Sequence, residues 1–471
     1  MDNWITSSTV EGLELRGTIL RLERFQVLFE FYQAGFSLRV SEVLQDFRVL
    51  LDNAEVYSGR AVVSSFLHTG TTTQCEVKLD EPGVQVSRDG AGNRTSDPLA
   101  AYSGFFSRWQ KEVKLQPDLK LAVLDLHSYL RNLKLLLEQM ALSHPTGNSS
   151  QRSDAMREAS EKLAPPVLSA IDGLRERFLV AAQRIEPELL PACRAFVQRH
   201  LHPHFLCAPF GERTYQKPLG YAGDYEMMNM IHRNTFEGDS WYAKLVHYWL
   251  VNQSPARSVR NRVAHMKSRL AAEAARTLCD RPVVRVLNLG CGPAREAQDF
   301  ITEYPESDHL EMTLVDFDRE TLDHAAAALE QARTRSGRAT RVLSRQLSVA
   351  QLIKDSTLRP RGDTHNLLGQ GFDLVYCGGL FDYFNDRMCQ QLVGLFYECL
   401  APGGLAVVAN MDDRVPFRRM LEFLLDWNLI YRDPQRMARM VPASVPRANW
   451  SVLSEPLTVN LFLEVRKPPS A

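Results

Sequence analysis

The sequence predicts an α/β protein: an open, doubly wound sheet in its C-terminal part, preceded by a helical region and a small N-terminal β-barrel or sandwich. From residue 281, short apolar runs alternate with helix-like segments, which is typical of a parallel sheet with crossover helices. Between residues 117 and 200, apolar residues recur at three- and four-residue steps, which indicates amphipathic helices. Before residue 80, short runs rich in Val, Ile, Leu, Phe and Thr are separated by glycines, which indicates strands.

The amino-acid composition argues against several classes of protein. The 471 residues include 55 Lys and Arg against 56 Asp and Glu, and this balance gives no electrostatic case for a nucleic-acid partner. No apolar run reaches the roughly 18 residues of a membrane helix, and the start, Met1 to Trp4, lacks the basic residues of a secretory signal. The 8 cysteines form no C-x-x-C pair, which argues against a disulfide scaffold or zinc site. We therefore expect a cytoplasmic protein without metal, nucleic-acid partner or integral membrane segment.

Changes in composition and in apolar periodicity divide the chain into four regions. We expect a β domain at residues 1–85, a helical region at 100–205, a lid and helical lead-in at 206–280, and an α/β domain at 281–471. The polar stretch 87–98 predicts a linker. The expected strands span residues 13–22, 26–31, 47–51, 60–67, 73–79, 283–289, 311–315, 341–345, 372–376, 405–409 and 459–465. The leucine-rich helices form either the core of a bundle or the seam of a homodimer.

The most informative segment is Val286-Leu-Asn-Leu-Gly-Cys-Gly-Pro293, in which an apolar strand runs into Gly290 and Gly292 and a helix follows. Two glycines one residue apart allow a sharp turn and a close approach of a ligand beyond the carboxyl end of the strand. A dinucleotide site would need a third glycine where Arg295 stands, and the Gly-Lys-Ser/Thr of a P-loop is absent. Asp316, at the end of the next strand, can accept both ribose hydroxyls of a bound adenosine, although NAD enzymes use an acid there too.

The run V-L-N-L-G-C-G-P resembles the first motif of class I S-adenosylmethionine-dependent methyltransferases. Four later segments match this family in order, at residues 314–318, 346–349, 372–379 and 400–407. The resemblance implies a seven-stranded Rossmann-like sheet with S-adenosylmethionine as cofactor. It implies that the cofactor is bound by Asn288, Gly290, Gly292, Asp316, Ser348, Val349 and Tyr376. The family usually has an acid at position 288, so Asn288 keeps an acceptor oxygen but loses the charge that helps hold the cofactor's amino group.

Residues ahead of the sheet supply further candidates. The segment 213–231 mixes Tyr, Lys, Asp and Gly, and such upstream segments in class I enzymes often fold over the site as a lid. Tyr221, Asp224 and Tyr225 are candidates for substrate contact, with both tyrosines as catalytic candidates; the alternative is a structural role in the lid. Arg260 shares a helix face with Arg257 and is a candidate for the cofactor's carboxylate, or else belongs to a solvated face.

On the acceptor side, Asp382 follows the fourth strand of the α/β domain and is the third catalytic candidate. It can act as a general base, orient the acceptor or cap the following helix. Neighbouring apolar residues line an acceptor pocket or belong to ordinary core, namely Phe381, Tyr383, Phe384, Phe417, Met420, Phe423 and Trp427.

The whole chain resembles bacterial methyltransferases that make 3-hydroxypalmitic acid methyl ester, an extracellular quorum signal. The resemblance implies an O-methyltransferase whose small-molecule acceptor is the carboxylate of a 3-hydroxy fatty acid. The β domain is similar to PilZ domains, but Arg16, Arg21 and Arg24 are misspaced and residues 38–44 lack the acid and glycine of the nucleotide motif, so we expect a degenerate domain. Two alternatives are methyl transfer to another small molecule or a protein side chain, and a regulatory protein that binds the cofactor without turnover, which Asn288 supports.

Overall fold

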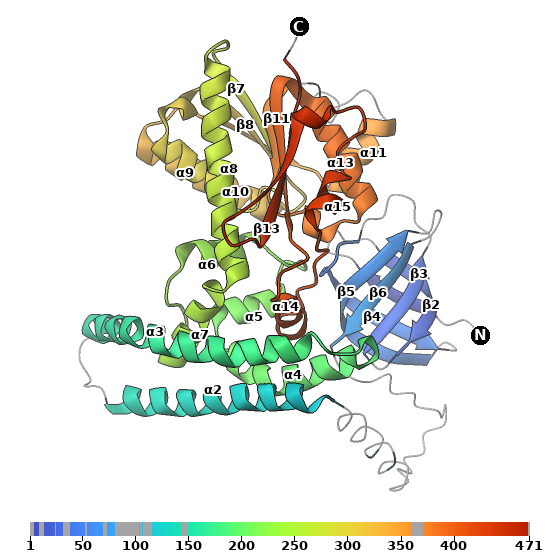
Figure 1. The fold of residues 1–471 in the computed structure, drawn as a ribbon, viewed down its shortest axis with the longest axis vertical. Coiled ribbons are helices and arrows are strands. Elements are labelled where there is room, and N and C mark those ends of the chain that lie inside the picture. The colour runs from blue at the N-terminus through green and yellow to red at the C-terminus, as the bar shows by residue number, and fades with distance from the viewer. Residues whose placement is uncertain are drawn as a thin grey trace.

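A computed structural model of the chain describes residues 4–8, 14–23, 25–31, 38–51, 54–68, 73–80, 115–143, 149–358 and 371–469, with residues 103, 106 and 369. The predicted linker at 87–98 and Arg24 lie outside these residues. Figure 1 shows a sheet with helices on both of its faces, a layer of long helices at the opposite end of the molecule, and a β-barrel beside them. Within the described ranges, no helix is long and apolar enough to cross a membrane.

Six strands close into an antiparallel barrel in the order β1-β2-β3-β6-β5-β4. They are β1 (Trp4–Ser8), β2 (Glu14–Leu22), β3 (Gln26–Phe31), β4 (Val43–Leu51), β5 (Ala54–His68) and β6 (Thr73–Leu79). Buried residues alternate along β3 and β6, so that Phe29 and Cys75 belong to the barrel core. The sequence does not predict β1, because three of its five residues are Thr or Ser, and its pairing with both β2 and β4 closes the barrel.

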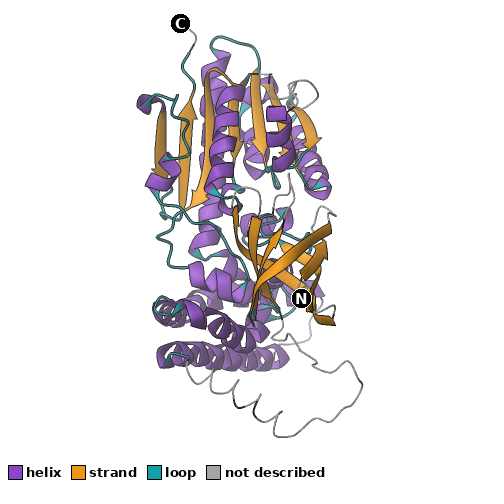
Figure 2. Cartoon of the chain, turned by 90° about the vertical axis from the view of Figure 1, so that its right-hand side faces the viewer, coloured by secondary structure: helices purple, strands orange, loops and turns teal. Residues whose placement is uncertain are grey.

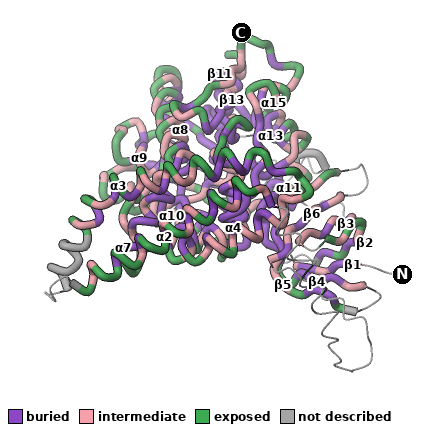
Figure 3. Tube along the Cα trace, turned by 60° about the horizontal axis from the view of Figure 1, so that its bottom comes forward, coloured by how far each residue is buried: buried purple, intermediate pink, exposed green. Residues whose placement is uncertain are grey.

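The long helices form a bundle below the sheet domain (Figure 1). The helices of this part are α2 (Pro117–Ser143), α3 (Ser149–Ala182), η1 (Pro187–Leu189), α4 (Leu190–Phe205), α5 (Pro209–Gln216), α6 (Tyr225–Arg233) and α7 (Trp241–Val251). One face of α2 packs in the core shared with α3, α4 and α7, and it buries Leu119, Val123, Leu126 and Leu130. These leucines therefore belong to a bundle core. Figure 3 shows exposed positions along α2. The exposed leucines of this helix are Leu121, Leu124, Leu135, Leu136 and Leu142.

Seven strands form the C-terminal sheet in the order β12-β13-β11-β10-β7-β8-β9, which confirms the predicted fold class. They are β7 (Val284–Leu289), β8 (Leu310–Asp316), β9 (Arg341–Gln346), β10 (Phe372–Cys377), β11 (Leu400–Met411), β12 (Trp450–Ser454) and β13 (Asn460–Arg466). The five strands from β7 to β11 pair with one another in parallel. Strand β13 is antiparallel to both of its neighbours, β11 and β12. The sequence does not predict β12, a short edge strand that pairs only with β13.

Helices cover both faces of this sheet (Figures 1 and 2). Helices α8 (Ser254–Leu278), α9 (Arg295–Glu303) and α10 (Arg319–Ser336) pack on one face, and α11 (Val349–Leu358) and α13 (Asp386–Cys399) pack on the other. The adjacent residues Val286 and Leu287 of β7 lie in these two different cores, so the strand is apolar on both faces. The remaining short helices are η2 (Pro305–His309), η3 (Phe381–Tyr383), α14 (Arg418–Leu424), α15 (Pro434–Ala438) and η4 (Arg447–Asn449).

The barrel docks through the segment before β4 and through a buried charge cluster. The Val43 N–H donates to the carbonyl of Gly220 at 2.8 Å, and the Ser41 hydroxyl both donates to and accepts from the backbone of Asn428. Asp426 is fully buried, accepts two hydrogen bonds of 2.6 Å from Arg194 of α4, and lies 4.0 Å from the guanidinium of Arg60 in β5 of the barrel. The barrel is therefore fixed to segments that border the site described next.

Candidate cofactor and acceptor site

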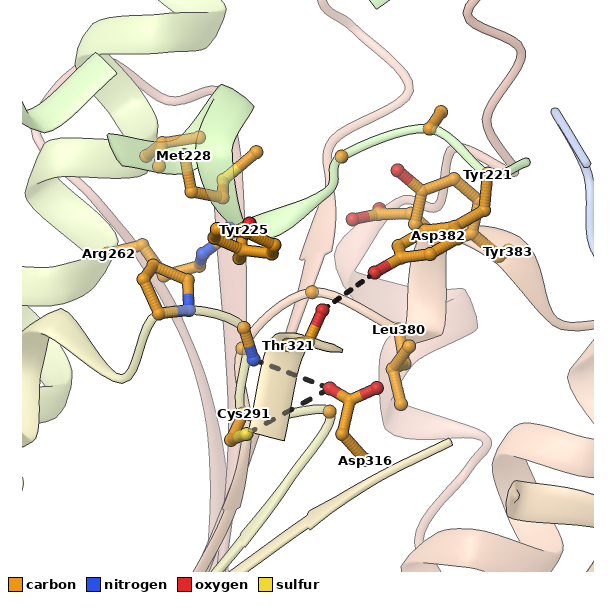
Figure 4. Close-up of a pocket in the computed structure, with 18 of the residues that line it drawn as sticks. Tyr221, Tyr225, Met228, Arg262, Cys291, Asp316, Thr321, Leu380, Asp382 and Tyr383 are labelled. Carbon is orange, nitrogen blue, oxygen red and sulfur yellow. Dashed lines mark hydrogen bonds between the residues drawn. The ribbon is translucent and has the colours of Figure 1, made fainter. Parts of the chain in front are cut away.

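A cavity lies at the carboxyl ends of β7, β8 and β10, where the strand order of the sheet reverses. The chain passes from β7 to β8 and β9 on one side, and then crosses to β10 on the other. Such a switch point leaves the crevice in which α/β proteins bind ligands. The turns after β7 and β10 line the cavity, and Met228 of α6 and Arg262 of α8 face it from the helical side (Figure 4).

The turn after β7 depends on two glycines. Both have left-handed backbones, with φ of +66° at Gly290 and +51° at Gly292. A Cβ on Gly290 would lie 2.5 Å from Cδ1 of Leu380, whereas a Cβ on Gly292 would meet no atom within 4 Å. Because Gly292 lines the cavity, its missing side chain leaves room for a ligand against the turn.

Asp316 ends β8 with its carboxylate beside this turn (Figure 4). Its Oδ2 accepts the N–H of Gly292 at 3.5 Å, and its Oδ1 accepts the N–H of Asp318 at 3.2 Å. The residue is 7% exposed, and burial raises the pKa of its carboxyl to about 6. A carboxylate held in place in this way can accept hydrogen bonds from the hydroxyls of a diol.

A second carboxylate, which the sequence analysis does not single out, lies beside Asn288. Glu296 is in the first turn of α9, and its Oε1 accepts hydrogen bonds from Nδ2 of Asn288 at 3.1 Å and from the Tyr376 hydroxyl at 2.8 Å. All three side chains are buried and line the cavity. Burial raises the pKa of Glu296. The acid that is missing at position 288 therefore has a counterpart at the start of the following helix.

The structure places Arg260 outside the cavity. Its guanidinium donates to the backbone carbonyls of Ile231 at 2.9 Å and Val251 at 2.8 Å, which ties α8 to α6 and α7. Arg262 lines the cavity instead and lies beside the glycines that follow β10. The structure therefore does not bring Arg260 to the cavity with the other cofactor candidates, because two positions along a helix rotate a side chain by about 200°.

Both lid tyrosines line the cavity, and their hydroxyls are bound to α10 and its N-terminal cap. The Tyr221 hydroxyl lies 3.0 Å from Oγ1 of Thr321 (Figure 4) and donates to Asp318 at 3.2 Å, and burial raises its pKa. Tyr225 donates to Glu320 at 2.7 Å, and this hydrogen bond raises the pKa of the phenol to about 12. The hydrogen bonds of both hydroxyls therefore hold the two tyrosines against α10 and its cap.

Three other candidates stabilise local structure and do not line the cavity. Asp224 caps α6 by accepting the N–H of Met227 at 2.8 Å. Ser348 precedes α11, and its hydroxyl accepts the N–H of Gln351 at 3.3 Å. Val349 begins the same helix and is buried in the core on that face of the sheet. The structure therefore does not bring Ser348 and Val349 to the cavity with the other cofactor candidates.

Asp382 lines the cavity after β10 and is 4% exposed. Its Oδ1 accepts the N–H of Met411 at 2.6 Å. Asn385 caps α13 instead, so the helix-cap alternative for Asp382 is excluded. Burial raises the pKa of this carboxyl, and a protonated carboxyl can donate a hydrogen bond.

The barrel also contributes to the cavity. Arg39 and Val40 line it from the segment before β4. The guanidinium carbon of Arg39 lies 3.6 Å from the ring centroid of Phe317, and the Val40 N–H donates to the carbonyl of Tyr383 at 3.4 Å. No local pattern signals these contacts, because the residues meet only through the docking of the barrel on the sheet domain.

The chemistry of these side chains fits S-adenosylmethionine. The methionine part of this cofactor is a zwitterion, and the cavity offers a carboxylate at Glu296 and a guanidinium at Arg262. The ribose part is a diol, and Asp316 is an acceptor for it. Because Gly292 has no side chain and no atom lies within 4 Å of the place a Cβ would take, a ligand has room beside the turn that lies between Glu296 and Asp316. Within the described residues, no group of three or more His, Cys, Asp and Glu is placed to hold a metal ion.

The fold and the site define a nucleotide-binding α/β domain, and comparison with known proteins specifies its class. Residues 287–406 match the family described as a methyltransferase domain. No curated protein sequence matches the chain. The chain therefore contains a methyltransferase domain, and the chemistry of the cavity fits S-adenosylmethionine as the cofactor of this domain.

Several solved structures match parts of the chain. A possible exported protein from Bordetella parapertussis is 17% identical over 69% of this chain and 100% of its own, with a TM-score of 0.42. Magnesium protoporphyrin IX methyltransferase from Synechocystis PCC 6803 is 11% identical over 51% of this chain and 93% of its own, with a TM-score of 0.32. The N-methyltransferase NodS from Bradyrhizobium japonicum is 14% identical over 54% of this chain and 99% of its own, with a TM-score of 0.29.

Arg260 and Arg262 of α8 give a matched pair of variants. Arg262→Met is expected to weaken binding of S-adenosylhomocysteine by about 10- to 100-fold, because a hydrogen bond to a charged group contributes about 1.5–3 kcal/mol. Arg260→Met is expected to lower the melting temperature and leave the dissociation constant unchanged, since its partners are backbone carbonyls. Isothermal titration calorimetry measures both affinities. A greater loss of affinity in Arg260→Met would contradict the placement of Arg262.

Proposed function

We propose that the chain transfers the methyl group of S-adenosylmethionine to the carboxylate of a fatty acid and so forms a methyl ester. A 3-hydroxy fatty acid is the candidate acceptor, because of the resemblance noted in the sequence. The observation that carries the proposal is an apolar cavity that adjoins the cofactor cavity. Val259 and Trp427 line both of them.

The second cavity has the chemistry of a site for an acyl chain. It lies among α5, α6, α7, α8 and α14, and Gln253 is its one polar lining residue among the described ones. Of the apolar candidates from the sequence, Phe417, Met420 and Trp427 line it, whereas Phe381, Phe384 and Phe423 line neither cavity. Each buried methylene of a ligand contributes about 0.8 kcal/mol of hydrophobic free energy. Each further methylene that the cavity can hold would therefore strengthen binding of the acceptor.

When bound, the cofactor supplies an electrophilic methyl group, whose bonding electrons remain on its sulfur when an acceptor oxygen takes the methyl. A fatty carboxylate is already ionised at pH 7, since carboxyl groups titrate near pH 4, so the chain needs no strong base. Asp382 can hold one acceptor oxygen by a hydrogen bond when its carboxyl is protonated, and burial shifts its pKa in that direction. The hydroxyl groups of Tyr221 and Tyr225 hold the lid segment against α10. A lid in this position excludes water and aligns the reactants.

The test is methyl transfer by the full chain from S-adenosylmethionine labelled in its methyl group. We expect label in an extractable methyl ester when long-chain free or 3-hydroxy fatty acids are supplied, and little with short-chain acids. Ala256→Leu fills only the apolar cavity, so it should lower turnover of long acceptors more than that of short ones and leave cofactor affinity unchanged. Label found only in protein or in polar acceptors would overturn the fatty-acid proposal. Cofactor binding without any transfer would favour a regulatory protein.

The proposed role of the barrel is structural docking rather than nucleotide sensing. Its segment 38–44, which is similar to part of the PilZ nucleotide motif, carries Arg39 and Ser41, and both are engaged with the sheet domain. A PilZ-like ancestry of the barrel and a homodimer of the chain are also parts of this proposal. Neither bears on the chemistry of the cavity.

A further inference from the structure

We propose that Glu296 binds the ammonium group of the cofactor's amino acid part and so replaces the acid that position 288 lacks. This inference rests on the cofactor assignment and is independent of the acceptor. It assigns a binding role to a residue of α9 that neither the glycine motif nor the strand pattern includes.

The position of Glu296 is fixed from two neighbouring strands. Asn288 comes from β7 and Tyr376 from β10, and these two residues are directly paired in the sheet. Both donate to the same oxygen, Oε1, at 3.1 and 2.8 Å. Two donors on one oxygen restrict the rotamer of the glutamate and leave the second oxygen, Oε2, to other partners. The residue is 8% exposed and lines the cavity next to Gly292 and Cys291.

A cation in contact with the buried carboxylate of Glu296 would stabilise its ionised form. Its side-chain hydrogen-bond donors, Asn288 and Tyr376, are neutral, and within the described part of the chain no Lys, Arg or His nitrogen is in ion-pair contact with it, although the positive charge of Arg262 acts on it from a distance and lowers its pKa. A buried carboxylate without a contacting cation is costly, and burial indeed raises the pKa of this group. An ammonium group that enters the cavity would supply the missing positive charge. The cation that a methyltransferase cavity receives in every cycle is the cofactor.

Asn288 gains a consistent role in the same arrangement. An aspartate at position 288 would place a second carboxylate against Oε1 of Glu296, at the 3.1 Å now spanned by the amide hydrogen bond. Two like charges at that distance repel each other and raise the pKa of one of them. Asparagine instead donates a hydrogen bond to Glu296. An amide at position 288 therefore fits beside Glu296, whereas an acid there would not.

The competing interpretation is structural: Glu296 braces β7 against β10 through its two hydrogen bonds and never contacts a ligand. The two interpretations differ in which ligands respond to a substitution. S-adenosylhomocysteine carries the ammonium group, whereas 5′-methylthioadenosine has the same adenosine and thioether but no amino acid part. Loss of an ammonium contact affects only the first ligand, while distortion of the turn affects both.

The experiment is calorimetric titration of the full chain with these two ligands. In Glu296→Gln, we expect the affinity for S-adenosylhomocysteine to fall by about 10- to 100-fold, with the affinity for 5′-methylthioadenosine unchanged. Adding Asn288→Asp to Glu296→Gln should restore part of the lost affinity, because a carboxylate returns to the same place. Tyr376→Phe is the control, since it removes one brace and keeps the charge, and its loss should be smaller and shared by both ligands.

An equal loss for both ligands in Glu296→Gln, or no loss for either, would overturn the proposal. A melting temperature within the wild-type range shows that the variant is folded. If wild-type protein binds neither ligand, the cofactor assignment itself fails, and that result is distinct from a failure of Glu296.

Discussion

Replacing Asp426 is expected to lower the free energy of unfolding by about 3–5 kcal/mol, because it leaves buried cations without their counter-ion. The Asp426 carboxylate is fully buried and accepts hydrogen bonds from Nε and Nη2 of Arg194, both at 2.6 Å. Arg60 of the barrel lies 4.0 Å away, and Lys217 and Lys78 add positive charge around it. Burial opposes the ionised form, yet these cations hold the pKa of Asp426 well below its usual range.

Asp426→Asn is the informative variant, since Asp426 has a left-handed backbone with φ of +48° that asparagine also tolerates. Thermal and denaturant unfolding measure the loss. Because the folded-state pKa is depressed, the stabilisation is present above the ordinary carboxyl pKa and is lost as the pH falls below it. The difference between wild type and Asp426→Asn should therefore shrink in acid. Equal melting temperatures of the two proteins at neutral pH would contradict this account of the cluster.

Gly290→Ala is expected to abolish measurable binding of S-adenosylhomocysteine, which corresponds to a loss of about 100-fold or more. A Cβ at this position would lie 2.5 Å from Cδ1 and 2.6 Å from Cγ of Leu380. Leu380 lines the cavity, so relieving this overlap displaces a wall of the site. The left-handed backbone at Gly290, with φ of +66°, adds about 1–2 kcal/mol of strain.

Gly337→Ala is the control that shows the effect of backbone strain without displacement of a cavity residue. Gly337 ends α10 with φ of +62°, and a Cβ there would meet no atom within 4 Å. Its substitution should cost the same strain in thermal unfolding while leaving the cofactor affinity intact. Calorimetry on both variants checks the contrast. Retained affinity in Gly290→Ala, or a comparable loss in Gly337→Ala, would show that the turn does not shape the site.

The sheet and barrel are largely predictable because periodicity acts locally. Strands β3 and β6 have the predicted residues, since apolar and polar residues alternate along them. Strands β1 and β12 are not predicted, because both are short and depend on pairing with strands distant in sequence. The glycine turn and Asp316 meet at the cavity as expected, because the carboxyl ends of adjacent parallel strands lie at one edge.

The charged groups of the site are less predictable, because a sequence pattern does not set the rotation of a helix against a sheet. Arg260 and Arg262 look equivalent in sequence, yet only Arg262 faces the cavity. Glu296 had one available signal: an acid in the first turn of the helix that follows the glycines. Arg39 had none, since its place in the cavity depends on the docking of the barrel.

The central claim is that adjoining cavities hold the cofactor and an acyl chain. The most direct measurement is a crystal structure of the chain with S-adenosylhomocysteine and a long-chain 3-hydroxy fatty acid. We expect the ribose at Asp316, the amino group at Glu296, and the acyl chain in the apolar cavity past Val259 and Trp427. A cofactor product bound away from the turn after β7, or an acyl chain outside that apolar cavity, would contradict the account.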